Sequence, residues 1–371
     1  MKIAIITFSD FNTNYGSMLQ AFSLKKYLES IGNDVEFIRY REFNTDLNEG
    51  VPLSIRVKNG IKKELLQIYA WLKKRDIKKT EYNFDQFVDN YLPHTELLTS
   101  SEEMKCKLKK YDCYICGSDQ IWNLSCLGGL RKPYFLDFAP EDALKFSYAA
   151  STGGYIIAKE YKAEVSALLK RLDYISVREK ESIEQIHKLA EKRVVDVVDP
   201  VFLTSEDAWG TIIPSIDTNG EYGVCYFVRR SKLGKRLVKE ALKYYKVPIY
   251  NLSDNMIYVN GTSTKYISSG PLEFASLIKN AKFVIGSSFH LAAFATIFNT
   301  PVLIAGMDSN RSRVCDLFSM VDNVNNYITE DAQIEECIKR LTDQRIIKTK
   351  LDEKIAFSKE YLDNALMTEK K

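Results

Sequence analysis

The sequence predicts an α/β protein built from two doubly wound, Rossmann-like domains that face each other across a cleft. Short apolar runs alternate with amphipathic segments along nearly the whole chain, which is the pattern of strand–helix–strand units and therefore of parallel sheets. The segment GTIIPSIDTNG at 210–220 interrupts this alternation with turn-forming residues, so we place a linker there. The 371 residues suffice for two hydrophobic cores, because single domains usually contain about 100–200 residues.

The first predicted domain covers residues 1–210. Its first apolar run, KIAIITF, is expected to be a buried strand, followed by a helix at 17–31 and a second strand at 34–40. We interpret about 42–93 as a helical insertion, with helices at 53–74 and 82–91, that shapes one side of the cleft. The remaining elements are strands at 111–116, 145–149, 173–177 and 194–198, and helices at 101–109, 161–172 and 179–190.

The second predicted domain covers residues 220–345 and repeats the strand–helix alternation. Its strands are expected at 222–228, 248–252, 282–285 and 301–304, and its helices at 232–245, 271–280, 289–298 and 334–341. The tail at 346–371 has helical periodicity as far as residue 366, and we expect it to pack back on the first domain.

The overall charge excludes some classes of function. A net charge of +3 is mildly basic, which suits an anionic substrate or a weak contact with the inner face of a membrane but not a nucleic-acid-binding stripe. No apolar run reaches the roughly 18–20 residues that span a bilayer. The apolar start of the chain ends at Ser9 and Asp10 without a cleavage pattern, so we interpret it as a strand and not as a signal peptide.

Seven cysteines are scattered along the sequence. Cys113 and Cys116 form a CxxC pair, but they lie inside the apolar run YDCYIC, where residues three apart point to opposite faces of a strand. We therefore expect two structural thiols and not a redox pair, and there is no second CxxC motif to complete a zinc site. Scattered free thiols fit a cytoplasmic location.

The segment SDFNTNYGSMLQAF follows the first strand, at the edge where open α/β sheets bind their ligands. Asn12, Asn14 and Gly16 form a polar loop, and Ser17 is a candidate helix cap whose exposed N–H groups would bind an anion or a sugar hydroxyl. An ordinary turn is the alternative. The loop lacks the GxGxxG fingerprint, which disfavours a nicotinamide cofactor.

The segment CGSDQIWN at 116–123 follows another predicted strand. Asp119, Gln120, Trp122 and Asn123 crowd into its loop, and this mixture of polar groups with an aromatic ring is typical of sugar sites. The alternative is a capped turn with Trp122 in the core.

Arg178 follows the predicted strand at 174–177, so its planar guanidinium would face the cleft and bind a carboxylate or phosphate. The alternative for Arg178 is a surface salt bridge with Glu179 or Glu181.

His290 lies in GSSFHLAAF, where Ser287 or Ser288 is expected to cap a helix directly after a strand. A histidine there can donate to an oxyanion or transfer protons, although a structural role is the alternative. His94 and His187 lack such a position, and one cleft histidine cannot make a metal site alone. Arg311 and Arg313, after the next strand, are further candidates for anion binding, or else a solvated helix start.

These segments, taken in order, resemble the blocks of the polysaccharide pyruvyl transferase family. The resemblance runs from residue 2 to about 317 and rests on NYGSMLQAF, YDCYICGSDQIWN, SYAASTGG, YISVREKES, VVDPVFLTSEDAW and GSSFH. It implies a GT-B-like fold, phosphoenolpyruvate as co-substrate, no other cofactor and no metal. The acceptor would be a sugar of a surface polysaccharide (capsule or exopolysaccharide), a glycan or a lipid-linked precursor, and the product a pyruvyl ketal.

The resemblance, together with the positions of these residues, gives each candidate a role. His290 would transfer protons, with Asp119 as a weaker candidate base, and the second domain would hold the donor. Many relatives have Ser-Arg-Leu-His where this chain has Ser287, Ser288, Phe289 and His290, which leaves open which arginine binds the donor phosphate. Donor-binding candidates are Arg178, Ser288, Arg311 and Arg313; acceptor-binding candidates, on the side of the insertion, are Asn14, Tyr15, Gly16, Ser118, Gln120, Trp122 and Asn123.

Two other functions remain open from the sequence. A GT-B glycosyltransferase would use the same fold with a nucleotide-sugar donor, since a fold does not fix a function. A non-catalytic sugar-binding protein of a polysaccharide locus would keep the cleft but would not need His290 and the arginines.

Overall fold

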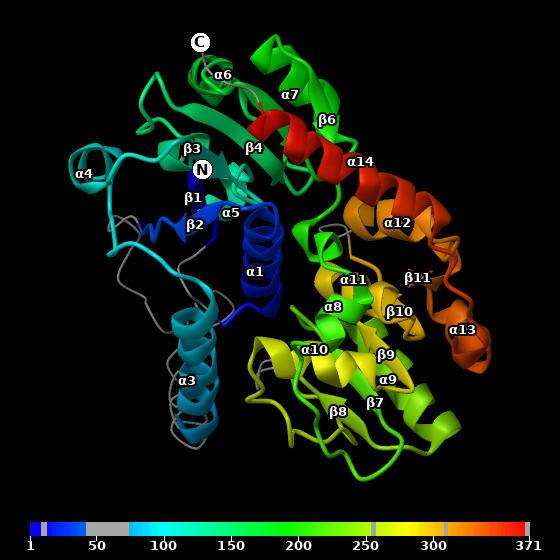
Figure 1. Cartoon of the computed structure of the whole chain (residues 1–371). Coiled ribbons are helices and arrows are strands. Elements are labelled where there is room, and N and C mark those ends of the chain that lie inside the picture. The colour runs from blue at the N-terminus through cyan, green and yellow to red at the C-terminus, as the bar shows by residue number, and fades with distance from the viewer. Residues whose placement is uncertain (9–12, 42–73, 254–256, 308–310, 368–371) are drawn as a thin grey trace, which may run out of the picture.

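The computed structural model describes residues 1–8, 13–41, 74–253, 257–307 and 311–367, and it contains two parallel sheets flanked by helices (Figure 1). The six strands of the first sheet have the order β2-β1-β3-β4-β5-β6. Their bounds are β1 Lys2–Ile6, β2 Asp34–Phe37, β3 Cys113–Cys116, β4 Leu144–Ala150, β5 Tyr174–Val177 and β6 Val194–Asp196. All of its neighbouring strands pair in parallel, as the alternating sequence pattern predicts.

The second sheet has five strands in the order β11-β10-β9-β7-β8, also parallel. Their bounds are β7 Gly223–Tyr226, β8 Ile249–Asn251, β9 Phe283–Gly286, β10 Val302–Ala305 and β11 Tyr327–Ile328. The central strands are apolar and buried along their whole length because helices cover both faces. Two parallel sheets with flanking helices are the α/β class that the sequence predicts.

Apart from the helix at 53–74, the described helices include those that the sequence predicts, in the predicted order, and α5, α8 and α12 in addition. They are α1 Tyr15–Ser30, α3 Lys74–Tyr91, α4 Ser101–Lys107, α5 Leu124–Leu127, α6 Lys162–Lys170, α7 Ser182–Ala190, α8 Glu206–Gly210, α9 Lys232–Tyr245, α10 Pro271–Lys279, α11 Phe289–Ile297, α12 Arg311–Met320, α13 Ile334–Arg340 and α14 Thr349–Leu366. No helix in the described ranges is long and apolar enough to cross a membrane.

Three local predictions need correction. Strand β2 ends at Phe37 and not at residue 40, and beyond it Tyr40 makes only an isolated bridge to Leu98. The cap of α1 is Asn14 and not Ser17, since the Asn14 side chain accepts hydrogen bonds from the amides of Gly16 and Ser17. Helix α3 begins at residue 74 and not at 82, whereas the helix predicted at 53–74 lies almost wholly outside the described residues.

The cysteines of β3 occupy opposite faces of the first sheet. Cys113 lies in one hydrophobic core and Cys116 in the other, and burial raises the pKa of both thiols. They are free and buried, as expected of structural thiols.

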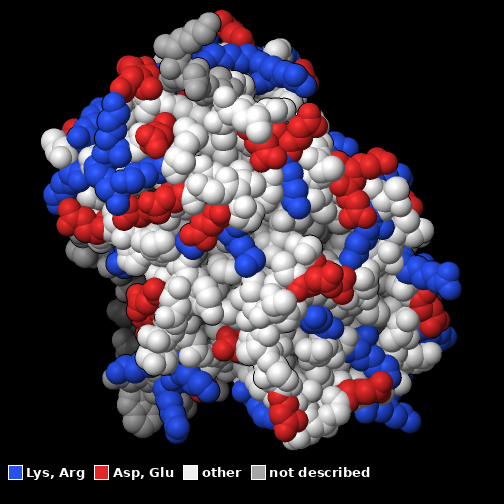
Figure 2. All heavy atoms as spheres, in the orientation of Figure 1, with Lys and Arg blue, Asp and Glu red and all other residues white. Residues whose placement is uncertain are grey.

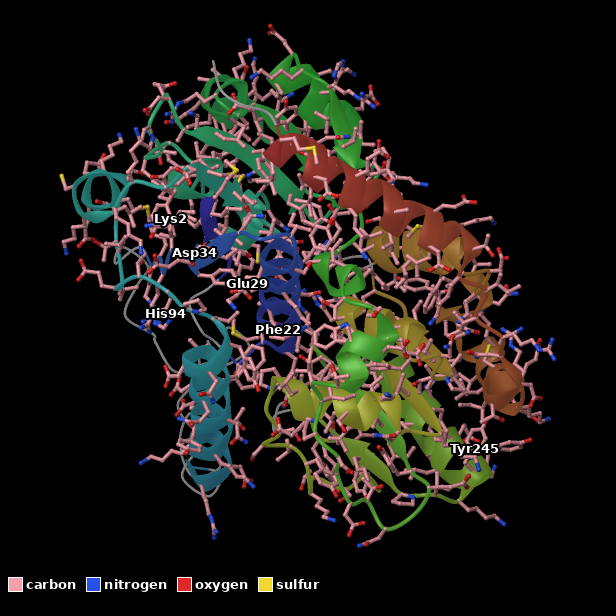
Figure 3. The ribbon with its side chains drawn as sticks, in the orientation of Figure 1. Lys2, Phe22, Glu29, Asp34, His94 and Tyr245 are labelled. Atoms are coloured by element: carbon pink, nitrogen blue, oxygen red, sulfur yellow. The ribbon has the colours of Figure 1, made fainter. Side chains whose placement is uncertain are left out.

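Helices α1, α10, α3 and α14 connect the two sheets. Tyr15 at the start of α1 stacks on Phe274 of α10, with ring centroids 4.4 Å apart. Phe22 of α1, labelled in Figure 3, packs against Phe87 of α3, and the Asn83 side chain of α3 donates to the carbonyl of Ser268. Helix α14 lies across the first sheet and ends near α6 (Figure 1). Its attachment uses hydrogen bonds from Tyr361 to the carbonyl of Ser147 and from the amide of Val198 to Ser358.

Candidate active site between the two sheets

A pocket opens where the carboxyl ends of the two sheets meet. Residues that follow β5 and β6 line it from one side, residues of α11 and α12 line it from the other, and α14 contributes one lysine. The lining residues are Arg178, Lys180, Asp196, Val197, Val198, Asp199, Phe202, Phe289, Arg313, Asp316, Leu317, Met320 and Lys354. Arg178 and Arg313, both predicted to bind an anion, are thus brought to the same pocket from opposite sheets.

Arg178 is buried and anchored by carboxylates. Its Nη1 donates to Oδ2 of Asp199 at 2.7 Å, and its Nε lies 3.5 Å from Oε1 of Glu179. Burial lowers the pKa of Arg178, but Glu179, Asp199 and Asp119 outweigh burial and raise it above its ordinary value. Nη2 is buried without a hydrogen-bond partner among the described residues, 3.9 Å from Asp119. A buried N–H without a partner is costly, which points to a ligand that accepts from it.

His290 lies in the first turn of α11, directly after β9. Ser288 occupies the cap position but makes no capping hydrogen bond through its side chain, and the Ser287 hydroxyl accepts from the amide of Val228. Nε2 of His290 lies 3.5 Å from Oδ2 of Asp199. Burial raises the pKa of Asp199, but His290 and Arg178 outweigh it and hold this pKa below its ordinary range. One buried carboxylate therefore lies beside both Arg178 and His290.

The first domain contacts the His290 ring through a glycine. A Cβ placed on Gly16, in the first turn of α1, would lie 2.0 Å from Nδ1 of His290. Only glycine fits such a close approach of the backbone to an aromatic ring. Because Gly16 has no side chain, the backbone of α1 in the first domain can pack directly against the ring of His290 in the second domain.

Asp119 has an unusual backbone. Its φ of +70° is uncommon for a residue with a side chain and costs about 1–3 kcal/mol, and such positions cluster at functional sites. Its carboxylate accepts a 2.6 Å hydrogen bond from Ser17 and lies on the Arg178 side of the cleft. Asp119 is thus near Arg178 and the pocket that Arg178 lines.

Two predicted acceptor residues lie in the core of the first domain. Trp122 is completely buried, stacks on Phe135 with centroids 5.3 Å apart, and donates to the carbonyl of Tyr134. Ser118 is also completely buried and donates to the carbonyl of Ala149. Neither side chain can contact an acceptor, so the prediction of Trp122 as a stacking platform is corrected to the core alternative.

The other predicted acceptor residues have different surroundings. Tyr15 is buried against Phe274 and donates to the carbonyl of Ser269, so its side chain connects the domains and does not face an acceptor. Gln120 and Asn123 are partly exposed and hydrogen-bonded to each other at 3.0 Å, beside Gly153. Asn14 is exposed at the cap of α1. Asn14, Gln120 and Asn123 are the predicted acceptor side chains that remain accessible.

The two candidate arginines of α12 have different surroundings in the structure. Arg313 is partly buried and lines the pocket, and burial together with the neighbouring Arg178 lowers its pKa. Arg311 is exposed at the start of the helix and does not line the pocket. Arg313 is thus the better placed of the two to bind an anion with Arg178.

The sequence interpretation did not single out Asp199, Glu179 or Lys180 for the site. Asp199 follows β6 at the same edge at which Arg178 follows β5, so the rule that identified Arg178 would have identified it too. Among the described residues, no group of three or more His, Cys, Asp and Glu side chains could hold a metal ion. The pocket offers a ligand four cationic side chains beside three aspartates and six apolar residues.

Comparison with known proteins identifies the family. The family model described as "Polysaccharide pyruvyl transferase" matches residues 14–309. Among curated proteins no match is found. The structure resembles that of MnaA of S. aureus in complex with UDP, with a TM-score of 0.54, 13% identity and 98% and 95% of the two chains covered. UDP-GlcNAc 2-epimerase of Neisseria meningitidis bound to UDP-GlcNAc gives a TM-score of 0.53, 11% identity and coverage of 99% and 100%.

Identities this low show a shared fold and nothing further. Two Rossmann-like domains facing across a cleft, as in these neighbours, are the GT-B arrangement, and the predicted fold class is confirmed. The family model covers most of the chain, from the cap of α1 to the segment before α12. The chain belongs to the polysaccharide pyruvyl transferase family.

Proposed function

We propose that this protein transfers the pyruvyl group of phosphoenolpyruvate to a sugar and forms a pyruvyl ketal. The observation that carries the proposal is the buried, unpartnered Nη2 of Arg178 in a pocket that also contains Arg313. Phosphoenolpyruvate has a carboxylate and a phosphate, and two guanidinium groups facing one pocket suit such a compact polyanion. Family membership supports a transferase, and the arginines support this donor.

In this proposal the donor lies between Arg178 and Arg313. Asp199 and Glu179 occupy Nη1 and Nε of Arg178, so the guanidinium presents Nη2 to the donor in a fixed orientation. Lys180 lines the same pocket and adds positive charge. The start of α11, with Ser288 at its cap, adds N–H groups suited to phosphate oxygens. The donor is then bound mainly by groups that do not need to reorganise during the reaction.

The chemistry proceeds through an oxocarbenium-like carbon. A proton is added to the methylene carbon of the donor, a sugar hydroxyl attacks the central carbon, and the bond from that carbon to the phosphate oxygen breaks. A second hydroxyl of the same sugar closes the ketal, and the two hydroxyl protons balance the new methyl group and the released hydrogen phosphate. His290 is our proton donor, because Nε2 of its ring lies 3.5 Å from Oδ2 of Asp199, a residue that lines the pocket. Asp119 is a weaker candidate for accepting a hydroxyl proton.

The acceptor would lie on the side of the first domain. Asn14, Gln120 and Asn123 are exposed or partly exposed there and offer amide groups to sugar hydroxyls. We propose a sugar of a surface polysaccharide, a glycan or a lipid-linked precursor as the acceptor class. The insertion at about 42–93, of which α3 is described, is proposed to border this side.

The test is ligand-dependent stability followed by phosphate release. A ligand bound only by the folded protein at 100 times its dissociation constant stabilises it by about 2.7 kcal/mol. We expect phosphoenolpyruvate to raise the melting temperature and UDP-sugars to leave it unchanged, with the rise lost in Arg313→Ala and retained in Arg311→Ala. A glycan acceptor should then release phosphate in a manner that His290→Gln abolishes.

Two results would overturn the proposal. Stabilisation by a nucleotide-sugar alone would indicate a glycosyltransferase. Binding of glycans without any turnover of phosphoenolpyruvate would indicate a sugar-binding protein.

A further inference from the structure

Helix α9 concentrates positive charge in a way that the proposed reaction does not use. Residues 229–246 contain eight Lys and Arg and one Glu, a net charge of +7, whereas the whole chain carries +3. The rest of the protein therefore has a net charge of −4. A protein that is mildly basic overall is thus acidic outside this stretch, so the basic character of the molecule is local.

The cations of α9 lie on one face of the helix. Spacings of three and four residues place side chains on the same side of an α-helix, and five cations of α9 follow such spacings. They are Lys232, Lys235, Arg236, Lys239 and Lys243, all exposed, and we call them the α9 stripe. At about 1.5 Å per residue, α9 is about 21 Å long, so the stripe forms a straight cationic edge.

The opposite face of α9 is fixed in the core. Leu237, Val238 and Ala241 are buried against the second sheet, and a Cβ on Gly234 would collide with the ring of Phe227. Tyr245, labelled in Figure 3, donates to the carbonyl of Ile338 in α13. The helix cannot rotate its stripe away from solvent, and the stripe is a permanent feature of the surface.

Few acidic groups neutralise the stripe. Arg236 pairs with Asp331 and Lys243 with Glu240, and such exposed pairs contribute only about 0–1 kcal/mol. Lys232, Lys235 and Lys239 have no ion-pair partner among the described residues. By contrast, the four cations of α3 are matched by four acidic residues in the same helix. Figure 2 shows Lys and Arg side chains, with some Asp and Glu among them, along the lower right edge, where α9 lies in Figure 1.

Exposed apolar residues accompany the cations. Val228 precedes the stripe and Tyr244 follows Lys243, and these side chains are 56% and 51% exposed. A row of cations with apolar side chains at its ends is the combination that binds at the headgroup level of an anionic bilayer, because lysine stems and a tyrosine ring are themselves amphipathic. Val228 in particular favours a bilayer over a soluble polyanion, because an exposed aliphatic side chain gains from contact with lipid.

We propose that the α9 stripe docks the protein on a membrane surface that contains anionic phospholipids. Helix α9 starts at the pocket edge of the second sheet, because the amide of Val228, three residues before the Ser231 cap, donates to Ser287, which closely precedes His290. This inference does not depend on the identity of the donor or on the proposed reaction.

The experiment is sedimentation of the full chain with vesicles of phosphatidylcholine alone and of phosphatidylcholine mixed with phosphatidylglycerol. We expect the protein to bind the anionic vesicles only. Binding should be lost in 0.5 M salt, where the Debye screening length is about 4 Å. The triple variant Lys232→Glu/Lys235→Glu/Lys239→Glu should bind at least about 100-fold more weakly, since each lysine contributes about fivefold near an anionic surface.

The matched control is Lys105→Glu/Lys159→Glu/Lys162→Glu, three exposed lysines of the first domain. It changes the net charge by the same amount and should bind like the unaltered protein. Equal loss in both variants would show a non-specific charge effect and overturn the proposal. Binding to soluble polygalacturonate without binding to anionic vesicles would also overturn the proposal. An unchanged melting temperature of each variant, measured without any ligand, would show that the fold is intact in both.

Discussion

Arg178 and His290 come from different domains but share a single oxygen atom, Oδ2 of Asp199. Nη1 of Arg178 lies 2.7 Å from this oxygen and Nε2 of His290 lies 3.5 Å from it. The Asp199 side chain is completely shielded from solvent. A carboxylate buried in this way is stable only with its partners, so removing its charge should affect both residues at once.

We therefore predict that Asp199→Asn, which keeps the shape but removes the charge, lowers the free energy of unfolding by about 3 kcal/mol at pH 7. The pKa of Asp199 is lower in the folded chain than the value of about 3.9 expected in the unfolded chain. The ionised Asp199 side chain therefore makes its full contribution to the free energy of unfolding above about pH 5. This contribution is lost as the pH falls through the pKa that Asp199 has in the folded chain. Urea unfolding at several pH values should show that the difference in free energy of unfolding between the unaltered protein and Asp199→Asn becomes smaller below about pH 4. A difference that stays constant down to pH 2 would contradict this assignment.

A second prediction concerns Gly16→Ala. Alanine normally stabilises a helix relative to glycine by about 1 kcal/mol, but here the new methyl group would lie 2.0 Å from the His290 ring. We expect a destabilisation of about 1–3 kcal/mol and a loss of activity, because His290 must move. In a His290→Ala background the same substitution should be neutral or stabilising. Additive effects in this double-mutant cycle, measured by denaturant unfolding, would show that Gly16 and His290 do not contact each other.

The fold was predictable because the strands are short apolar runs, each followed by an amphipathic helix. Local errors arose where a tertiary contact decided the outcome. Asn14 caps α1 because its side chain accepts from the amides of Gly16 and Ser17, whereas the hydroxyl of Ser17, the predicted cap, donates to Asp119, more than 100 residues away in the sequence. Strand order and the stacking of Tyr15 on Phe274 also depend on pairings between distant segments, which no local pattern encodes.

The sequence predicted some residues of the candidate site but not all of them. Arg178 and His290 were found because the carboxyl end of a parallel strand is a position that can be inferred from the sequence. Their shared partner Asp199 satisfies the same rule, but a buried charge pair is recognisable only when both partners are placed. Trp122 was misassigned because an aromatic residue in a polar loop gives the same sequence pattern whether it faces solvent or the core.

The third prediction separates the two arginines of α12. Arg313→Ala should weaken phosphoenolpyruvate binding by about 10–100-fold, as expected for the loss of a hydrogen bond between charged groups worth about 1.5–3 kcal/mol. Arg311→Ala, which removes an exposed side chain of the same type, should change binding less than about twofold. Isothermal titration with phosphoenolpyruvate would measure both dissociation constants. A larger loss of affinity in Arg311→Ala than in Arg313→Ala would show that phosphoenolpyruvate binds outside the pocket lined by Arg178.

The fourth prediction tests the corrected position of Trp122. Trp122→Phe would remove the buried hydrogen bond that the indole donates to the carbonyl of Tyr134 and should lower the free energy of unfolding by about 1–3 kcal/mol. The KM for the acceptor should stay unchanged, because a completely buried side chain cannot contact it. Gln120→Ala, two residues earlier and partly exposed, should show the opposite behaviour: a higher acceptor KM and nearly unaltered unfolding. Urea unfolding and acceptor titrations on both variants distinguish a core residue from a binding residue. A raised acceptor KM in Trp122→Phe at unchanged stability would restore the stacking platform that the loop sequence suggests.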